Sequence, residues 1–336
     1  MTERVYSSAV VGLGNIGMLA EADPKRLKPA SHVGMHLGSS RVRLIGLVEI
    51  DAEKRRYAEE RWKIPVFASI EELFKKEIPD ILSVATANEA HVPVVLTAAA
   101  AKVPAIICEK PIADSIENGG LMIAACKESG SLLFVNHFRR FLPFVQKVRR
   151  QIVDEQVIGR IQQVRGLYAM GLYEMGTHLV DLFRFFLGEV EWVMGVHNKK
   201  AWNQFPGDYC ADAILGFQDD VHAVIQSVDR KSWSTFEIQF VGTIGTLTLR
   251  DLGRTAEIVL AADSRLYSGF RELDYATRHS ESVESESFFT PLLENVIACL
   301  DEKAKPASIG EDGVAVLTVL AALRQSAEGN GVRVDL

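Results

Sequence analysis

The chain has 336 residues, 48% of them hydrophobic and 24% charged, and its formal net charge is −7. These values are ordinary for a globular enzyme, they exclude an intrinsically disordered chain, and the length favours two domains over one. The basic residues are scattered along the sequence, which argues against binding to nucleic acid or to an anionic membrane, so we expect a small-molecule partner.

The cysteines and the hydropathy pattern bear on metal binding and location. Four cysteines, Cys108, Cys126, Cys210 and Cys299, lie far apart without CxxC spacing, which argues against a zinc site and a disulfide framework. No signal-peptide core precedes the first β-like run, and no window reaches 18 uninterrupted apolar residues. We therefore expect a cytoplasmic protein without a bound metal or a membrane span.

Short β-branched runs alternate with helix-like stretches in the first third of the chain. Five candidate strands read SSAVVGLG, VRLIGLVEI, DILSVATAN, PAIICEK and SLLFVNH, at residues 7–14, 42–50, 80–88, 104–110 and 131–137. This rhythm is typical of βαβ units around a parallel sheet. The sequence therefore predicts an α/β N-terminal domain over residues 1–137.

The pattern changes after residue 138. Residues 160–170, 211–228 and 234–251 form longer β-like runs with partial alternation and hairpin-like turns, which favour a mostly antiparallel sheet with one buried face. The C-terminal region indicates two helices separated at Lys305–Pro306 and a last strand in VRVDL. We expect residues 138–336 to form a second, α+β domain.

A glycine-rich turn follows the first candidate strand. Gly12, Gly14 and Gly17 have GxGxxG spacing, with Asn15 and Ile16 between the last two glycines. Glycines at these positions let the chain turn tightly and let backbone N–H groups approach a pyrophosphate. Such spacing also occurs by chance, but the preceding strand and the βαβ rhythm favour a dinucleotide-binding Rossmann domain.

Glu49 ends the second candidate strand, where a carboxylate accepts hydrogen bonds from ribose hydroxyls and repels a 2′-phosphate. NAD is therefore expected over NADP. The alternative is a solvated strand end, and Asp51 is interpreted as a helix cap. Glu49 lies much further after Gly17 than the spacing of about 20 residues in the usual motif. The excess, residues 19–30, predicts a Pro-containing insertion that delays the first helix to near Ser31 and forms a flap over the cofactor.

Five motifs in this order resemble the Gfo/Idh/MocA oxidoreductase family: the glycine turn, TANEAH (86–91), CEKP (108–111), NHFRRFLP (136–143) and GTHLVDLFRFFLG (176–188). The family includes inositol and sugar dehydrogenases, and the likeness covers nearly the whole chain. It implies a Rossmann domain, a C-terminal α+β domain with a large open sheet, and a cofactor between the two. It also implies a homodimer or homotetramer formed through that sheet.

The resemblance assigns cofactor and catalytic roles near the CEKP motif. Lys110 follows a strand, and its ammonium group is expected to bind the reacting oxygen and stabilise alkoxide charge; an isolated Lys-Pro would instead be read as a surface lysine. Glu109 is expected near the nicotinamide ribose. Thr86, Asn88 and His91 match a loop that lies near the cofactor, although His91 alternatively begins a helix.

His178 is the expected acid-base residue. The family motif here commonly reads D-x-G-x-H, and Glu174 stands where the aspartate is expected, so Glu174 is a candidate catalytic or substrate-binding residue with an altered reach. At about 100° per residue, a helix that includes Glu174 would place it in one sector with His178 and Asp181. Asp181 is interpreted as support for the helix start or for His178.

Further substrate contacts are expected from Asn136 and Arg139, beside Lys110, Glu174 and His178. Aromatic residues Tyr168, Tyr173 and Trp202 are weaker candidates for stacking on a sugar ring, since aromatic residues more often lie in a core.

These observations predict an NAD-dependent oxidoreductase that acts on a secondary alcohol or ketone of a sugar, cyclitol or sugar derivative. One alternative is a nucleotide-sugar or aminosugar oxidoreductase with retained, recycled NAD. Another is a non-catalytic NAD-binding regulator, which the presence of both Lys110 and His178 disfavours.

Overall fold

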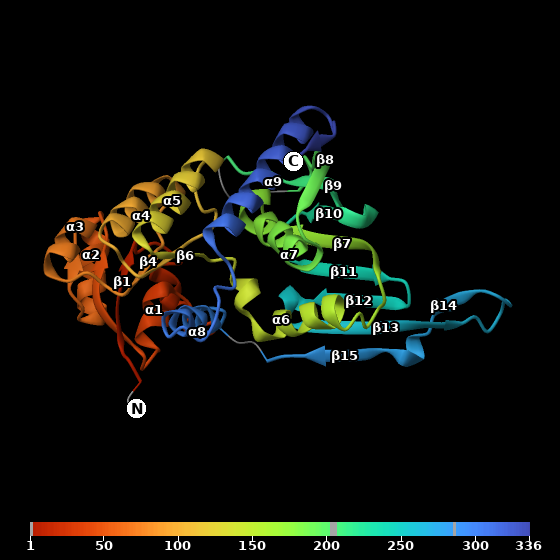
Figure 1. Cartoon of the computed structure of the whole chain (residues 1–336), viewed down its shortest axis with the longest axis horizontal. Coiled ribbons are helices and arrows are strands. Elements are labelled where there is room, and N and C mark those ends of the chain that lie inside the picture. The colour runs from red at the N-terminus through yellow and green to blue at the C-terminus, as the bar shows by residue number, and fades with distance from the viewer. Residues whose placement is uncertain (1–2, 202–206, 285–286) are drawn as a thin grey trace. The chain divides into compact units, whose positions relative to one another are not determined.

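The computed structural model describes residues 3–201, 207–284 and 287–336 (Figure 1). The chain divides into two compact units, residues 1–142 with 286–317 and residues 143–285 with 318–336. The sequence-based division, with one boundary after residue 137, stays a proposal. It assigns all of residues 138–336 to the second domain, whereas the compact units place residues 286–317 with the first unit.

The first unit contains a six-stranded parallel sheet in the order β3-β2-β1-β4-β5-β6. Its strands are β1 Tyr6–Val11, β2 Val42–Val48, β3 Val66–Phe67, β4 Ile81–Val84, β5 Ala105–Cys108 and β6 Leu132–Val135. This is the strand order of a Rossmann domain, so the predicted fold class is confirmed. Strand β3 was missed because two residues are too short to show a period.

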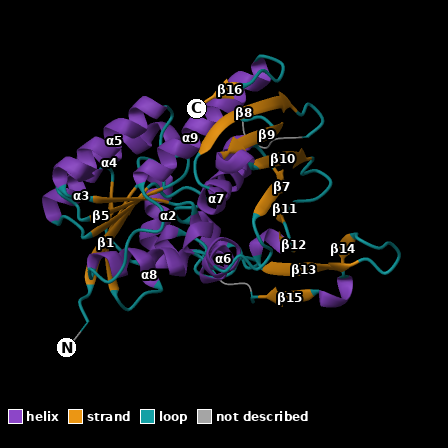
Figure 2. Ribbon diagram, turned by 45° about the vertical axis from the view of Figure 1, so that its right-hand side comes forward, coloured by secondary structure: helices purple, strands orange, loops and turns teal. Residues whose placement is uncertain are grey.

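Helices pack about this sheet (Figure 2). They are α1 His32–Leu37, α2 Ala52–Trp62, α3 Ile70–Lys76, α4 His91–Ala100, α5 Ile116–Ser129 and α8 Phe289–Leu300. Side-chain oxygens of Ser31, Asp51, Ser69 and Ser115 accept backbone N–H bonds at the starts of α1, α2, α3 and α5. These caps explain where the four helices begin, and they confirm the interpretation of Asp51 as a cap.

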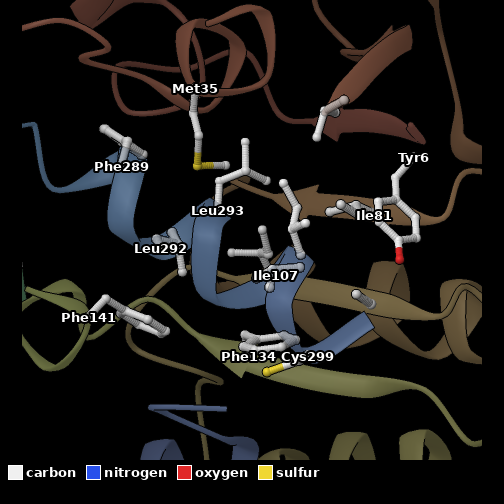
Figure 3. Packing of buried hydrophobic residues seen from close by; sticks show 14 residues of the cluster. Tyr6, Met35, Ile81, Ile107, Phe134, Phe141, Phe289, Leu292, Leu293 and Cys299 are labelled. Atoms are coloured by element: carbon white, nitrogen blue, oxygen red, sulfur yellow. The ribbon is translucent and has the colours of Figure 1, made fainter. Parts of the chain in front are cut away.

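Helix α8 completes the hydrophobic core of the first unit. Its residues Phe289, Leu292 and Leu293 are buried in one cluster with Ile107 and Phe134 of the parallel strands, and Figure 3 shows Cys299 of the same helix beside Phe134. A segment from much later in the sequence therefore covers one face of the sheet, which removes apolar side chains from water.

Residues 20–31 interrupt the first helix after the glycine turn. The N–H of His32 donates to the carbonyl of Ile16 at 3.0 Å, and Val33 N–H donates to Gly17 at 3.0 Å. In an uninterrupted α-helix, the N–H of residue 20 would donate to the carbonyl of Ile16. His32 takes that place here, so residues 20–31 are an insertion. Without the insertion, the spacing from Gly17 to Glu49 returns to the usual value of about 20 residues. The predicted delay to Ser31 is confirmed.

The second unit is built on a ten-stranded sheet in the order β14-β13-β12-β11-β7-β10-β9-β8-β16, with β15 paired to β13. Its strands are β7 Ile161–Ala169, β8 Val190–His197, β9 Ala211–Phe217, β10 His222–Val228, β11 Phe236–Gly242, β12 Gly245–Arg250, β13 Thr255–Asp263, β14 Arg271–Leu273, β15 His279–Ser282 and β16 Val334–Asp335. Only β7 and β10 pair in parallel among these strands, so the mostly antiparallel sheet is confirmed.

One face of this sheet is covered by α7 (Thr177–Leu187), and the unit also contains α6 (Pro143–Arg149). A Cβ atom at Gly166 would lie 2.7 Å from Leu179, so the glycine lets α7 approach β7 closely. Apolar side chains on β8 and β9, namely Met194, Val196 and Ile214, are 39–49% exposed. Helix α9 (Gly310–Glu328) belongs to the first unit up to Leu317 and to the second unit beyond it.

Within the described residues, no helix has the length and apolar character that crossing a membrane requires.

A histidine is buried beneath the parallel sheet. His36 Nε2 lies 2.8 Å from Ser83 Oγ, and His36 is fully enclosed. Burial, reinforced by the neighbouring His32, lowers the pKa of His36 to about 3. The folded state therefore carries a neutral imidazole at neutral pH.

The buried histidine predicts a specific loss of stability in acid. Because the pKa of His36 falls from 6.5 to about 3 on folding, the unfolded chain binds an extra proton between these pH values, and stability falls as the pH drops, by up to about 1.4 kcal/mol per pH unit. The double variant His36→Leu/Ser83→Ala should lose less free energy of unfolding between pH 6.5 and pH 4.5 in urea titrations. The exposed-histidine variant His222→Gln should keep the wild-type slope; an unchanged slope in the double variant would contradict the prediction.

Candidate active site

The glycine turn of the first unit is held tightly against the end of β4. Gly12 has a φ of +91°, and a Cβ atom there would lie 2.6 Å from the N atom of Thr86. A Cβ atom at Gly17 would collide with the carbonyl oxygen of Gly12, whereas one at Gly14 would have no atom within 4 Å. Asn15 and Ile16 form the part of the turn between Gly14 and Gly17. Two glycines thus permit close backbone packing, and Gly14 leaves an open approach to the backbone.

Glu49 is 7% exposed and closes this turn from the side of β2. Its Oε2 accepts from Leu13 N–H at 2.7 Å, and its Oε1 accepts from Asp51 N–H at 3.0 Å. The solvated strand end considered from the sequence does not describe this carboxylate. Each oxygen keeps a second acceptor position, so the geometry is compatible with ribose hydroxyls as well.

Glu109 lies at the carboxyl end of β5 and is held by two side chains. His32 Nε2 lies 2.8 Å from Glu109 Oε1, and Asn136 Nδ2 donates to the same oxygen at 2.5 Å. Burial by itself raises the pKa of Glu109, but the His32 and Asn136 hydrogen bonds and the charge of Lys110 hold it below its ordinary value. Glu109 is therefore a buried carboxylate with a fixed orientation.

His91, the first residue of α4, connects two loops at the same edge of the sheet. Its Nδ1 lies 3.0 Å from the carbonyl of Pro111, and its Nε2 lies 3.3 Å from the carbonyl of Thr86. The ring is almost completely buried. This geometry suits a residue that sets the loop beginning at Lys110; a direct contact of His91 with the cofactor remains a prediction.

Polar atoms at this edge fit a dinucleotide. The side-chain oxygens Thr86 Oγ1, Asn88 Oδ1 and Asn136 Oδ1 are buried without a hydrogen-bond partner among the described residues. All three follow the carboxyl ends of β4 or β6, where ligands bind in open α/β sheets. Unsatisfied buried polar atoms are costly, and a bound polar ligand would supply partners. Together with the open backbone at Gly14, the residues present fit a dinucleotide.

Lys110 and the arginines complete the polar groups of the first unit. Lys110 is half-buried two residues after β5, and its peptide bond to Pro111 is cis. Arg139, in the 3₁₀ segment Phe138–Phe141, is buried with its guanidinium 4.5 Å from the Phe138 ring centroid. Arg140 pairs with Asp312 at 2.9 Å, so the adjacent arginines have different surroundings.

In the second unit, His178 and Asp181 lie on the buried α7. The expected apolar stripe of α7 is present, because Leu179, Leu182 and Phe183 are buried, but His178 and Asp181 are 3% and 1% exposed. The helix is thus enclosed around most of its circumference. A histidine and a carboxylate so deeply buried require polar partners, which favours a specific role over a solvated one.

Glu174 does not lie in the α-helix. Residues Leu172–Gly176 form a π-helical turn, and α7 begins at Thr177. The expected alignment of Glu174 with His178 at 100° per residue therefore does not apply, because a π turn has a wider period. Glu174 is half-buried, and its backbone N–H donates to Asp208 Oδ2 at 3.1 Å.

Among the aromatic candidates, Tyr168 is fully buried and its hydroxyl donates to the carbonyl of Ala211 at 2.8 Å, so it belongs to the core. Tyr173 is half-buried in the π turn. Trp202 lies outside the described residues.

Two residues were missed in the sequence. His32 is separated from the glycine turn by the insertion, so no motif spacing indicates it. Asp208 lies outside every element expected from the sequence, and it contacts a turn 34 positions earlier, which no local pattern reveals. For metals, the described residues contain no group of three or more His, Cys, Asp or Glu side chains placed to hold an ion.

Comparisons with known proteins agree with this geometry. A family model described as an oxidoreductase family with an NAD-binding Rossmann fold matches residues 7–137, and the C-terminal alpha/beta domain of an oxidoreductase family matches residues 151–336. The chain is 24% identical over 323 residues to D-apiose dehydrogenase of Paraburkholderia graminis, covering 86% of this chain and 82% of that protein. It is also 24% identical over 318 residues to 1,5-anhydro-D-fructose reductase of Ensifer adhaerens, covering 87% and 91%.

A solved structure shares the fold. The WlbA dehydrogenase from Bordetella pertussis, in complex with NADH and UDP-GlcNAcA, superposes with a TM-score of 0.79 at 21% identity, covering 100% of this chain and 99% of that one. The family model that matches residues 7–137 is described as NAD-binding, so NAD is the nucleotide of the first unit, as the glycine turn and Glu49 indicated.

Alanine variants of two glycines separate folding from cofactor binding. Gly12→Ala should lower the free energy of unfolding by about 1–3 kcal/mol, because of its positive φ and the contact with Thr86. Gly14→Ala should leave the unfolding temperature without NAD unchanged but weaken NADH binding about tenfold or more, because its methyl group occupies the open approach. Thermal unfolding and NADH fluorescence titration measure the two effects.

Gly120→Ala is the matched control, since a Cβ atom at Gly120, within α5, also has no neighbour within 4 Å. Gly120→Ala should leave the NADH affinity unchanged and should not lower the unfolding temperature. Wild-type NADH affinity in Gly14→Ala would contradict the placement of the pyrophosphate at the turn.

Proposed function

The chain belongs to the Gfo/Idh/MocA oxidoreductase family, and on this premise we propose that it is an NAD-dependent dehydrogenase or reductase. Its proposed substrate is a secondary alcohol or ketone of a sugar, cyclitol or sugar derivative. The observation that carries the proposal is the open glycine turn at the same sheet edge as the buried Glu109 and its neighbour Lys110. The sugar-like substrate is supported by the substrates named for the relatives.

The oxidation separates a carbinol into a hydride and a proton. NAD, held by the glycine turn and Glu49, would supply the acceptor for the hydride and its electron pair from the carbinol carbon. The hydroxyl proton must go to the protein, because an alcohol is only weakly acidic in water. We assign this proton to the imidazole of His178, and the reverse transfer accompanies ketone reduction.

Lys110 has the complementary task. Its ammonium group donates a hydrogen bond to the reacting oxygen and stabilises the negative charge that develops there as the proton leaves. Glu109, held by His32 and Asn136, places a fixed negative charge next to Lys110 in the chain. Glu174, Asn136 and Arg139 are assigned to substrate hydroxyls.

The proposed cofactor contacts follow the same sheet edge. We assign the pyrophosphate to the turn of Gly12, Gly14, Asn15, Ile16 and Gly17. The adenine ribose is assigned to Glu49, whose negative charge disfavours a 2′-phosphate. The nicotinamide end is assigned to the group formed by Thr86, Asn88, His91, Glu109 and Lys110.

We also propose a cytoplasmic homodimer or homotetramer formed through the C-terminal sheet. All four cysteines are free and buried, which suits a reducing compartment. The sheet face with Met194, Val196 and Ile214 carries a cavity of about 300 Å³ whose lining includes these three residues. An exposed apolar patch of this kind favours association with a second copy.

A spectrophotometric screen tests the substrate class. D-apiose, 1,5-anhydro-D-fructose, inositol and a UDP-aminosugar are offered with NAD or NADH, and absorbance of the reduced nicotinamide is followed. Turnover with at least one member is expected, and rates far higher with NADP would contradict the assignment of Glu49. Absorbance that rises on substrate addition after exhaustive dialysis would instead identify the enzyme with retained NAD.

Lys110→Ala should abolish turnover of the substrate found in this screen while NADH still binds. The reason is that the variant removes the ammonium group and leaves the glycine turn and Glu49 in place. NADH fluorescence titration and the absorbance assay measure the two properties. Loss of NADH binding in a folded Lys110→Ala protein would show that the lysine serves the cofactor rather than the chemistry. Lys127→Ala, an exposed lysine on α5, is the control.

Ile214→Asp should convert the oligomer to monomers, because burying an unpaired carboxylate in an apolar interface is costly. Multi-angle light scattering measures the mass. Leu266→Asp, which changes a 78% exposed leucine outside this face, should keep the wild-type mass. An oligomer that survives Ile214→Asp would locate the interface elsewhere.

A further inference from the structure

Asp208 caps the turn that carries Glu174. Its Oδ1 accepts from Tyr173 N–H at 3.0 Å and from Tyr209 N–H at 2.7 Å, and its Oδ2 accepts from Glu174 N–H at 3.1 Å. Backbone N–H groups at the start of a helix have no intrahelical acceptor, and a capping side chain is one of the groups that satisfy them. Here the cap comes from a different segment of the chain, the one that leads into β9.

The turn is shaped to receive this carboxylate. A Cβ atom at Gly171 would collide with Asp208 Oδ2, so the glycine leaves the space that the carboxylate occupies. Gly171 also accepts backbone bonds from Met175 at 2.9 Å and from Gly176 at 3.1 Å, which define the wide π turn. π turns of this kind are frequent at functional sites and hold their residues away from α-helical positions.

The Asp208 carboxyl group is affected by its burial and by its neighbours. Burial raises the pKa of Asp208, the three backbone N–H groups oppose that rise, and the charge of Glu174 adds to it. The Asp208 carboxylate therefore accepts hydrogen bonds from backbone N–H groups, and one of these bonds fixes the backbone of Glu174.

We propose that Asp208 is a positioning residue for the reaction, acting through Glu174. It fixes the backbone of Tyr173 and Glu174 in the π turn and so determines where the Glu174 carboxylate stands for the substrate. The proposal rests on the proposed function, because it requires Glu174 to contact the substrate. A displacement near 1 Å at such a group costs up to about a hundredfold in rate.

The local effect is measured without any substrate. In hydrogen-exchange mass spectrometry of the full chain, Asp208→Ala should accelerate exchange in the peptide covering Leu172–Gly176, because the amides of Tyr173 and Glu174 lose their acceptor. Gly171→Ala should do the same, since its methyl group displaces the carboxylate while the charge remains. Asp208→Asn, which keeps one side-chain oxygen, should give an intermediate rate.

Asp212→Asn is the matched control. Asp212 Oδ1 likewise accepts a backbone bond, from Ser227 N–H at 2.8 Å, in the same unit. It should lower stability without changing exchange in the Leu172–Gly176 peptide. Unchanged exchange in both Asp208→Ala and Gly171→Ala would overturn the proposal.

The catalytic effect is measured as a double-mutant cycle on the substrate with the highest rate in the screen above. Asp208→Ala should lower kcat about 10- to 100-fold with the KM for NAD unchanged, and it should add little in the Glu174→Gln background. Asp212→Asn should keep kcat. Wild-type kcat in Asp208→Ala, or additive losses in the cycle, would overturn the positioning role.

The two levels of the proposal fail differently. If Glu174→Gln keeps wild-type kcat, the assignment of Glu174 to the substrate fails, and the positioning role fails with it. If Glu174→Gln lowers kcat and the loss is additive with Asp208→Ala, only the positioning role fails.

Discussion

The buried carboxylate of Glu109 is the constraint around which the first unit is organised. An ionised carboxylate in the protein interior requires hydrogen-bond donors, and it receives them from α1 through His32 and from the end of β6 through Asn136. Both donors bind the same oxygen, so the carboxylate has one orientation. Because Lys110 is the next residue, the position of its ammonium group, to which we assign the chemistry, depends on a helix and a strand that lie far from it in sequence.

The insertion before α1 leaves His32 in the position from which it binds Glu109. Residues 20–31 leave the helix after its first turn, yet the N–H of His32 donates to the carbonyl of Ile16, as residue 20 of an uninterrupted helix would. The insertion closes on itself, because Glu21 Oε2 accepts from Ala30 N–H and Ser31 Oγ, each at 2.8 Å. A long excursion is therefore tolerated without moving the histidine that holds Glu109, in keeping with the modest entropic cost of lengthening a loop.

Local patterns predicted the elements better than the contacts between them. Five of the parallel strands, the helix delayed to Ser31 and the final strand follow from period, glycine spacing and capping, which are properties of neighbouring residues. The π turn at Glu174 could not be predicted, because it depends on Asp208 and on the space at Gly171. His32 was missed for the same reason: its partner Glu109 is 77 residues away, and a single sequence carries no record of that contact.

The two units fix their acidic groups by different means. Glu109 is held through its own side chain, whereas Glu174 is held through its backbone, by a carboxylate that caps its turn. From the same backbone position, a glutamate carries its carboxylate one methylene, about 1.5 Å of bond length, further out than an aspartate would. A carboxylate fixed through its own side chain, as Glu109 is, suits a group that takes the same position whichever substrate is bound. The arrangement at Glu174 suits a group whose reach adapts to the substrate, which is where a departure from the D-x-G-x-H pattern can alter specificity while the cofactor site stays unchanged.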